Sequence, residues 1–105
     1  MNETIKEYID NDGLRIVETY YDNKLYRRTS YYTHHKKAII SDCYYLNLEF
    51  HREDGPAYIY YHNNNGGLPH YGGHIINRDY YLYGKKYTKE NYNKTIKILK
   101  NLKKL

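Results

Sequence analysis

Tight-turn sequences interrupt this chain at short, regular intervals, and the runs between them are rich in tyrosine, isoleucine and threonine. A spacing of about 8–12 residues with turns between predicts an antiparallel meander of strands, not alternating strand–helix units. The longest loop is expected at 63–73, which is rich in glycine and asparagine. Strands are expected at residues 4–9, 14–21, 25–33, 38–46, 48–53, 57–62 and 74–82, with a short one at 86–88.

The C-terminal segment has a different period. Thr88 is a suitable N-cap, and Glu90 lies where a helix dipole favours an acid. Apolar residues from Tyr92 to Leu105 fall on one half of a helical projection, although Lys103 also lies there. The sequence therefore predicts an amphipathic helix at 89–104, which packs on the sheet or on a partner. Its opposite half carries four lysines, Lys94, Lys97, Lys100 and Lys104.

The length of 105 residues predicts one domain, with a β-hairpin body at 1–88 and a basic helix at 89–105. Ten of the 17 tyrosines form five doublets, at 20–21, 31–32, 44–45, 60–61 and 80–81. Adjacent strand residues point to opposite faces, so each doublet places a ring on each side of the sheet. The outward rings are either covered within the chain or exposed for a partner. The candidate binding tyrosines are Tyr31, Tyr32, Tyr60, Tyr61, Tyr80 and Tyr81.

The doublets also mark an internal repeat. The segment 20–28 aligns with 44–52 at an offset of 24 residues, and 44–52 aligns with 80–88 at an offset of 36. Each unit has the pattern strand, tight turn, strand. Such a hairpin cannot bury its own face, so it is expected to stack on its neighbours.

The segment 50–59, with its sequence FHREDGPAYI, resembles the HREDGPA repeat, a MORN-like hairpin unit found in tandem in proteins of giant viruses, phages and AT-rich bacteria. The match is good over 44–59, except that Leu48 stands where the family has a turn glycine, and the flanking copies are degenerate. The resemblance implies stacked antiparallel hairpins with a scaffold or interaction role. It implies neither an enzymatic activity nor a common ligand.

The motif itself predicts a structural turn. Asp54, Gly55 and Pro56 form a turn sequence, and Arg52 lies two residues before Asp54. We expect the Arg52 guanidinium and the Asp54 carboxylate to close this turn by charge-assisted hydrogen bonds, in preference to contacting a ligand.

The histidines and the lone Cys43 form no recognised metal or nucleophile signature. His70 and His74 are four residues apart, but Gly72 and Gly73 between them argue against a helix face. We therefore expect a non-enzymatic protein without a metal or cofactor. No apolar run approaches the ~20 residues of a membrane span, and no leader sequence opens the chain. A cytoplasmic location is expected.

The charge is unevenly distributed along the chain. Residues 85–105 hold eight lysines and one glutamate, a net +7, so residues 1–84 carry −2 of the total +5. Two functions remain. One is a protein-binding module, encoded by a virus or phage, which blocks a host defence protein in the manner of an anti-CRISPR protein. The other is nucleic-acid binding, with the helix lysines on phosphates and exposed tyrosines on bases. The oligomeric state is open.

Overall fold

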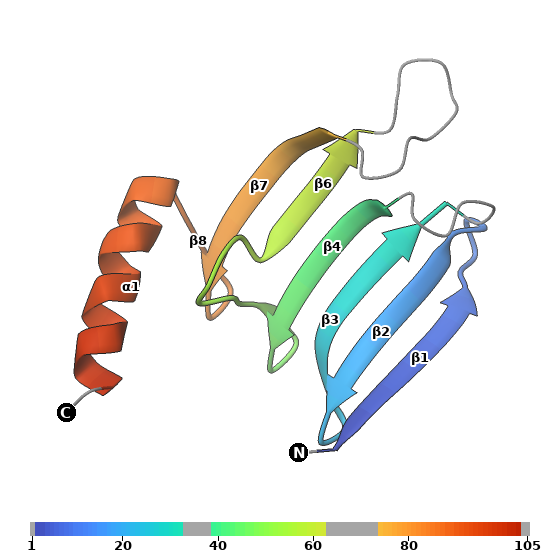
Figure 1. Ribbon diagram of the computed structural model, residues 1–105, viewed down its shortest axis with the longest axis horizontal. Coiled ribbons are helices and arrows are strands. Elements are labelled where there is room, and N and C mark those ends of the chain that lie inside the picture. Colours follow the sequence, from blue (N-terminus) through green and yellow to red (C-terminus); the bar gives the residue numbers. More distant parts are fainter. Residues whose placement is uncertain (1, 33–38, 63–73, 104–105) are drawn as a thin grey trace.

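A computed structural model of the chain describes residues 2–32, 39–62 and 74–103 (Figure 1). The antiparallel meander with a C-terminal helix is confirmed. The main sheet has the order β1-β2-β3-β4-β6-β7-β8, and β5 pairs with the end of β4. The turn expected at 34–37, most of the loop expected at 63–73 and Lys104 lie outside the described residues. The elements are β1 (Glu3–Ile9), β2 (Arg15–Tyr21), β3 (Lys24–Tyr31), β4 (Ile39–Leu46), β5 (Glu49–Phe50), β6 (Tyr58–His62), β7 (His74–Leu82), β8 (Lys85–Tyr87) and α1 (Lys89–Lys103).

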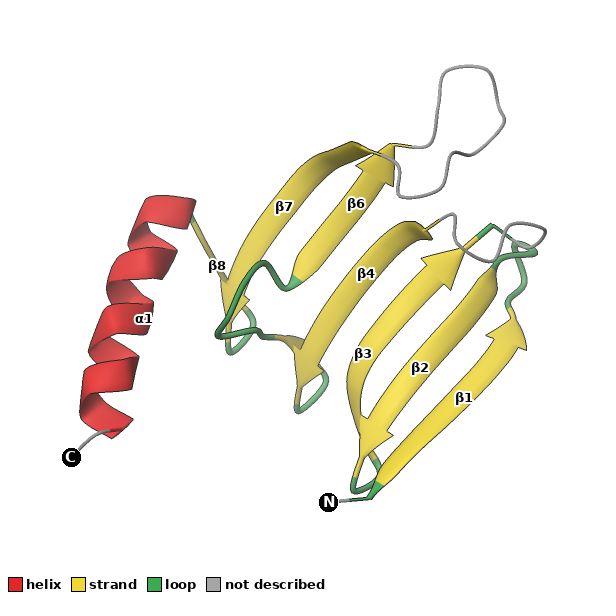
Figure 2. Cartoon of the chain, viewed as in Figure 1, coloured by secondary structure: helices red, strands yellow, loops and turns green. Residues whose placement is uncertain are grey.

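The sheet is a single curved layer, and α1 lies beside its β7–β8 end (Figure 2). Thr88 caps the helix as predicted, because its Oγ1 accepts the N–H of Asn91 at 3.2 Å. Tyr92 and Ile96 of α1 pack with Leu82 of β7 in a small buried cluster. The helix therefore covers one end of the sheet, and it does not form a second layer over β1–β4. No described helix is long and apolar enough to cross a membrane.

Three hairpins have the same two-residue turn. Both turn residues have positive φ angles in each case, as type I′ turns require. The angles are 51° and 69° at Asp22 and Asn23, 51° and 67° at Asn47 and Leu48, and 50° and 81° at Tyr83 and Gly84.

These turns correct the alignment of the first repeat. The turn residues of the first and second hairpins are 25 residues apart, not 24, whereas the second and third agree with the predicted offset of 36. A β-bulge explains the slip. Tyr20 pairs with Leu25 and Thr19 with Arg27, so Tyr26 is an extra residue in β3. The extra residue restores the sequence match after the turn and hides the shift before it.

The strand expected at 48–53 is wrong in length. β5 ends at Phe50, and the chain then leaves the sheet before it returns as β6. His51 donates its N–H to the carbonyl oxygen of Tyr44 at 3.1 Å, and Tyr44 donates its own to Ala57 at 2.8 Å. Residues 51–57 therefore form an excursion opposite the single residue Tyr44. The 51–54 side chains do not alternate along a strand as expected.

Candidate functional site

The excursion 51–57 joins the second hairpin to the third. Arg52 donates its N–H to the carbonyl of Tyr81 at 3.2 Å, and Ala57 donates to Asp79 at 2.9 Å. Gly84, in the third turn, donates to the carbonyl of Phe50 at 2.9 Å. The HREDGPA-like motif is thus a connector between consecutive hairpins.

The Arg52 side chain holds the excursion in shape. Its Nε donates to Asp54 Oδ1 at 2.9 Å, which is the bond predicted from the sequence, and its Nη1 lies 3.2 Å from the carbonyl oxygen of Pro56. The guanidinium also stacks on Tyr44, with 4.0 Å between Cζ and the ring centroid. A Cβ at Gly55 would lie only 3.1 Å from Arg52 Cζ, so glycine fits this close approach. These contacts use Arg52, Asp54, Gly55 and Pro56 within the chain.

His51 is a further structural residue, and its role was not predicted from the sequence. The ring is almost buried, and its Nδ1 accepts the N–H of Tyr83 at 2.9 Å. Its Nε2 lies 3.0 Å from Glu53 Oε2, and Lys103 of α1 also binds Glu53. Both contacts lower the pKa of Glu53, with the Lys103 hydrogen bond the larger cause. Lys103 falls on the apolar side of the helix because it meets this carboxylate.

Charged residues on the central strands are also paired within the chain. The Asp42 side chain on β4 is almost fully buried, and Arg27 binds both of its oxygens, at 2.8 and 2.7 Å. Thr29 donates its hydroxyl to the same carboxylate at 3.0 Å. The Asp42 hydrogen bond raises the pKa of the Arg27 guanidinium. This network resembles a structural ion pair more than a catalytic site, because no nucleophile adjoins it among the described residues.

The second aromatic cluster lies where the second and third hairpins meet. Phe50 packs against Tyr45, Tyr58 and Tyr81, with ring centroids 5.3, 5.9 and 5.0 Å apart. Burial raises the pKa of Tyr45 to about 12. Aromatic rings thus fill this junction, which has few aliphatic residues.

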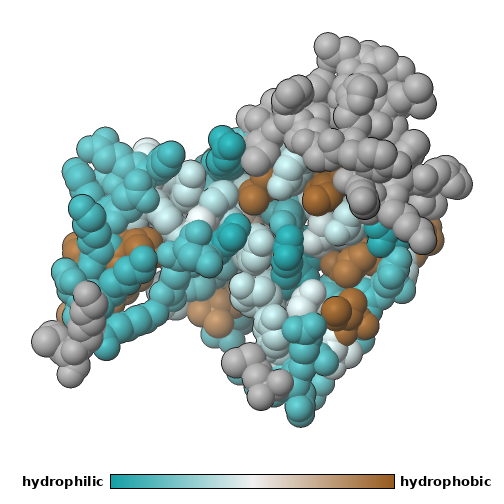
Figure 3. Space-filling view, in the orientation of Figure 1, coloured by the Kyte–Doolittle hydropathy of each residue, from teal (hydrophilic) through white to brown (hydrophobic). Residues whose placement is uncertain are grey.

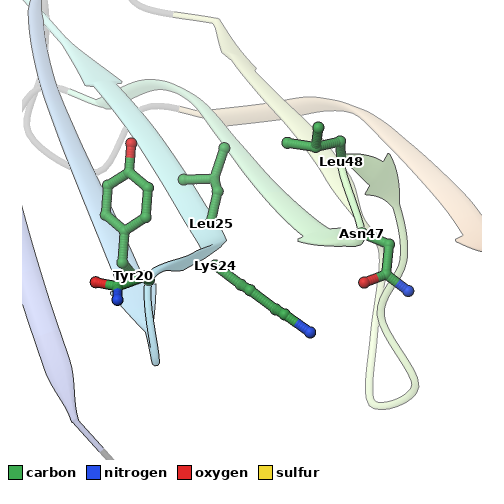
Figure 4. A pocket seen from close by; sticks show the side chains of 6 residues that line it. Tyr20, Lys24, Leu25, Asn47 and Leu48 are labelled. Carbon is green, nitrogen blue, oxygen red and sulfur yellow. The ribbon is translucent and has the colours of Figure 1, made fainter.

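The corresponding space between the first and second hairpins is open. It is a groove of about 480 Å³ between the β2–β3 and β4–β5 turns. In Figure 4, Tyr20 and Leu25 extend in the same direction from neighbouring strands, and Leu48 lies across the gap. We call this the tip groove. Its lining residues are Tyr20, Asn23, Lys24, Leu25, Asn47 and Leu48.

The difference between these two junctions follows from the repeat. The second hairpin continues into the excursion 51–57, which binds the third turn. The first hairpin continues directly from Tyr26 along β3, which pairs with β4. Its degenerate motif retains only Arg27 and Arg28, so there is no excursion to bind the second turn. The tip groove lies where that connection is missing.

Leu48 is the most unusual residue of the tip groove. Its φ angle of 67° lies in the left-handed region, where a non-glycine residue costs about 1–2 kcal/mol. Its side chain is 82% exposed, so packing within the chain does not offset that cost. Asn23 and Gly84, the equivalents of Leu48 in the other two turns, both tolerate this conformation. The absence of the family's turn glycine was visible in the sequence, and it was the available signal for this site.

The predicted tyrosines have varied surroundings. Tyr80 packs on Tyr92 at 4.8 Å, and Tyr81 packs on Phe50 at 5.0 Å, so both contribute to contacts within the chain. Tyr31 lies under the Arg15 guanidinium at 4.1 Å, and it is half-buried. Tyr60 alone among the six is exposed, and Tyr32 and Tyr61 are half-buried. The structure does not gather the six into one surface.

The predicted lysines Lys94, Lys97 and Lys100 are exposed on α1. Lys94 also lies 3.4 Å from Glu90, one turn earlier in the helix. In Figure 3, apolar residues appear as small separate patches among polar ones, over both the sheet and the helix. The visible face therefore has no single continuous apolar surface.

No metal site is found in the part of the chain that the structure describes, since no group of three or more suitable ligands occurs there. Cys43 is buried, and burial raises the pKa of its thiol. Comparison with known proteins found no match: no family model, no curated protein and no solved structure resembles this chain significantly.

Proposed function

We propose that this chain is a non-enzymatic protein-interaction module that binds its partner at the tip groove. The observation that carries the proposal is Leu48, an exposed aliphatic side chain held in an unfavourable backbone conformation. Such local strain persists at functional sites, where it presents a side chain to a ligand. Tyr20 and Leu25 supply further apolar surface on the opposite wall.

A more specific form concerns the identity of the partner. We propose a host defence protein in the cytoplasm, which the chain blocks sterically, as an anti-CRISPR protein does. The support for a viral or phage origin is the resemblance of residues 44–59 to repeats found in such proteins. The small size of the chain suits a steric inhibitor.

The test compares capture of proteins from host-cell extract by the unchanged chain and by two variants. Leu48→Asn keeps a residue that tolerates the turn conformation but removes the apolar side chain. Ile98→Asn is the matched control, because Ile98 is also exposed but lies on α1, away from the groove. We expect one captured protein to be lost with Leu48→Asn and retained with Ile98→Asn, and to bind the purified chain directly. Equal capture by both variants would contradict the proposal.

Nucleic-acid binding is the second candidate, favoured by the exposed Lys94, Lys97 and Lys100 on one helix. Lysine contacts to phosphates release counterions, so binding would weaken steeply with salt. Titration of a fluorescent DNA or RNA oligomer at several salt concentrations tests this function. Binding that disappears when Lys97 and Lys100 are both changed to glutamine would support it. The absence of binding at low salt would exclude it.

A further inference from the structure

β1 is an exposed edge strand. All seven residues of Glu3–Ile9 are exposed, and Ile5 and Ile9 keep 59% and 54% of their surface accessible. β1 ends the strand order on this side, whereas α1 packs against β7 and β8 near the other end (Figure 1). Edge strands are commonly protected by proline or by a bulge. β1 has neither, since its register with β2 runs without a shift.

The backbone of β1 offers hydrogen-bonding groups on its outer side. Asp10 donates to the carbonyl of Leu14, and Asp22 donates to that of Asn2, each at 2.9 Å. These bonds involve even-numbered residues at the two ends of β1. Because antiparallel pairing alternates, the even-numbered residues bond to β2, and the odd-numbered ones direct their amide and carbonyl groups away from the sheet. The outward residues are Glu3, Ile5, Glu7 and Ile9.

We propose that β1 pairs antiparallel with β1 of a second copy of this chain, around a two-fold axis at Glu7. In this register, each Ile5 lies opposite Ile9 of the second copy, on the same face. On the other face, each Lys6 lies opposite Tyr8 of the second copy, where its ammonium can approach the aromatic ring. The outward backbone groups form about six hydrogen bonds between the copies.

Charge selects this register over its neighbours. An axis at Lys6 places the two Lys6 side chains directly opposite each other, and an axis at Ile5 places Glu3 opposite Glu7. Like charges directly opposite each other destabilise a strand pair. The axis at Glu7 also brings two carboxylates together. However, each Glu7 is already bound to Arg15 of its own chain, with 2.9 Å between Oε1 and Nη1.

The same geometry limits the assembly to two copies. A two-fold axis uses the same surface of both chains, so pairing at β1 is closed and leaves no second β1 edge available. The surface is separate from the tip groove, because no residue of β1 lines that groove. Failure of the partner-binding proposal would therefore leave this inference unaffected.

Disulfide trapping tests the register. In a Cys43→Ala background, we expect Glu7→Cys to form a disulfide-linked dimer under mild oxidation. Cα atoms of a hydrogen-bonded pair lie about 5.5 Å apart, which suits a disulfide. Lys6→Cys is the matched control, and it should remain largely unlinked. Efficient linkage through Lys6→Cys, or no linkage through Glu7→Cys, would overturn the register.

A second measurement needs no cysteine and tests the pairing itself. Sedimentation of the full chain over a range of concentrations should show a monomer–dimer equilibrium. Glu7→Pro removes an outward N–H and leaves the β1–β2 bonds in place, so the variant should be monomeric with an unchanged circular dichroism spectrum. A monomeric unchanged chain at all concentrations, or a folded Glu7→Pro variant that still dimerises, would refute the proposal.

Discussion

The Tyr92 hydroxyl of α1 binds Gly55 of the excursion 51–57 through both backbone groups of that residue. It accepts the Gly55 N–H at 3.2 Å, and it lies 2.9 Å from the Gly55 carbonyl oxygen. The Arg52 carbonyl oxygen is also within hydrogen-bond distance, so the single hydroxyl proton has two alternative acceptors. One side chain therefore connects the helix to the connector between two hairpins.

Removal of this hydroxyl should destabilise the protein. Tyr92→Phe keeps the buried ring but leaves the Gly55 N–H without this acceptor, which should lower the free energy of unfolding by about 1–2 kcal/mol. Urea denaturation measures the change. Tyr60→Phe is the control, because Tyr60 is exposed, and its effect should stay within about 0.5 kcal/mol. Equal effects of the two variants would show that the Tyr92 contact contributes little.

His51 should be important through its acceptor at the Tyr83 amide. His51→Ala removes that acceptor and leaves a largely buried cavity, so we expect a loss of about 1–3 kcal/mol. His51→Asn places an oxygen near the position of Nδ1 and should be less harmful. Hydrogen exchange at the Tyr83 amide distinguishes the two variants. Faster exchange in the alanine variant alone is expected, and unchanged exchange in both would be evidence against this role.

The turn at Leu48 should become more stable with glycine. Leu48→Gly relieves the unfavourable φ angle but adds freedom to the unfolded chain, so we expect a net gain of about 0.5–1 kcal/mol. Thermal or urea unfolding reports it. Glu49→Gly is the matched control in the adjacent strand, where glycine should be destabilising. A loss of stability in Leu48→Gly would mean that this side chain packs within the chain after all.

Alkaline pH should destabilise the fold through Tyr45. Burial raises the pKa of Tyr45 from 10.0 to about 12, so the folded state retains a proton that the unfolded state loses. The stabilising effect of this burial is present below pH 10 and is lost as the pH rises to about 12. Urea midpoints measured across this range should fall. Tyr45→Phe should reduce the slope, and an unchanged slope would argue against Tyr45 as a cause.

Local sequence determined much of the architecture. The turn residues and the spacing between them predicted the meander, and the position of β7 agrees with its predicted range. The helix was predicted from its N-cap and its apolar period, which depend on neighbours within a few residues. The Arg52–Asp54 bond was also predictable, because its partners are two residues apart.

Tertiary structure decided the features that depend on distant contacts. The excursion 51–57 leaves the sheet because Phe50, Arg52 and Ala57 bond to the third hairpin, about 30 residues further along the chain. The first repeat could not be aligned correctly without the bulge at Tyr26, since strand pairing fixes its register. The sequence determined the hairpins, their turns and the helix through short-range conformational preferences. Only the tertiary structure decided which junctions are filled by aromatic rings, which groove stays open and which strand edge is left exposed, because backbone pairing between separate hairpins sets all three.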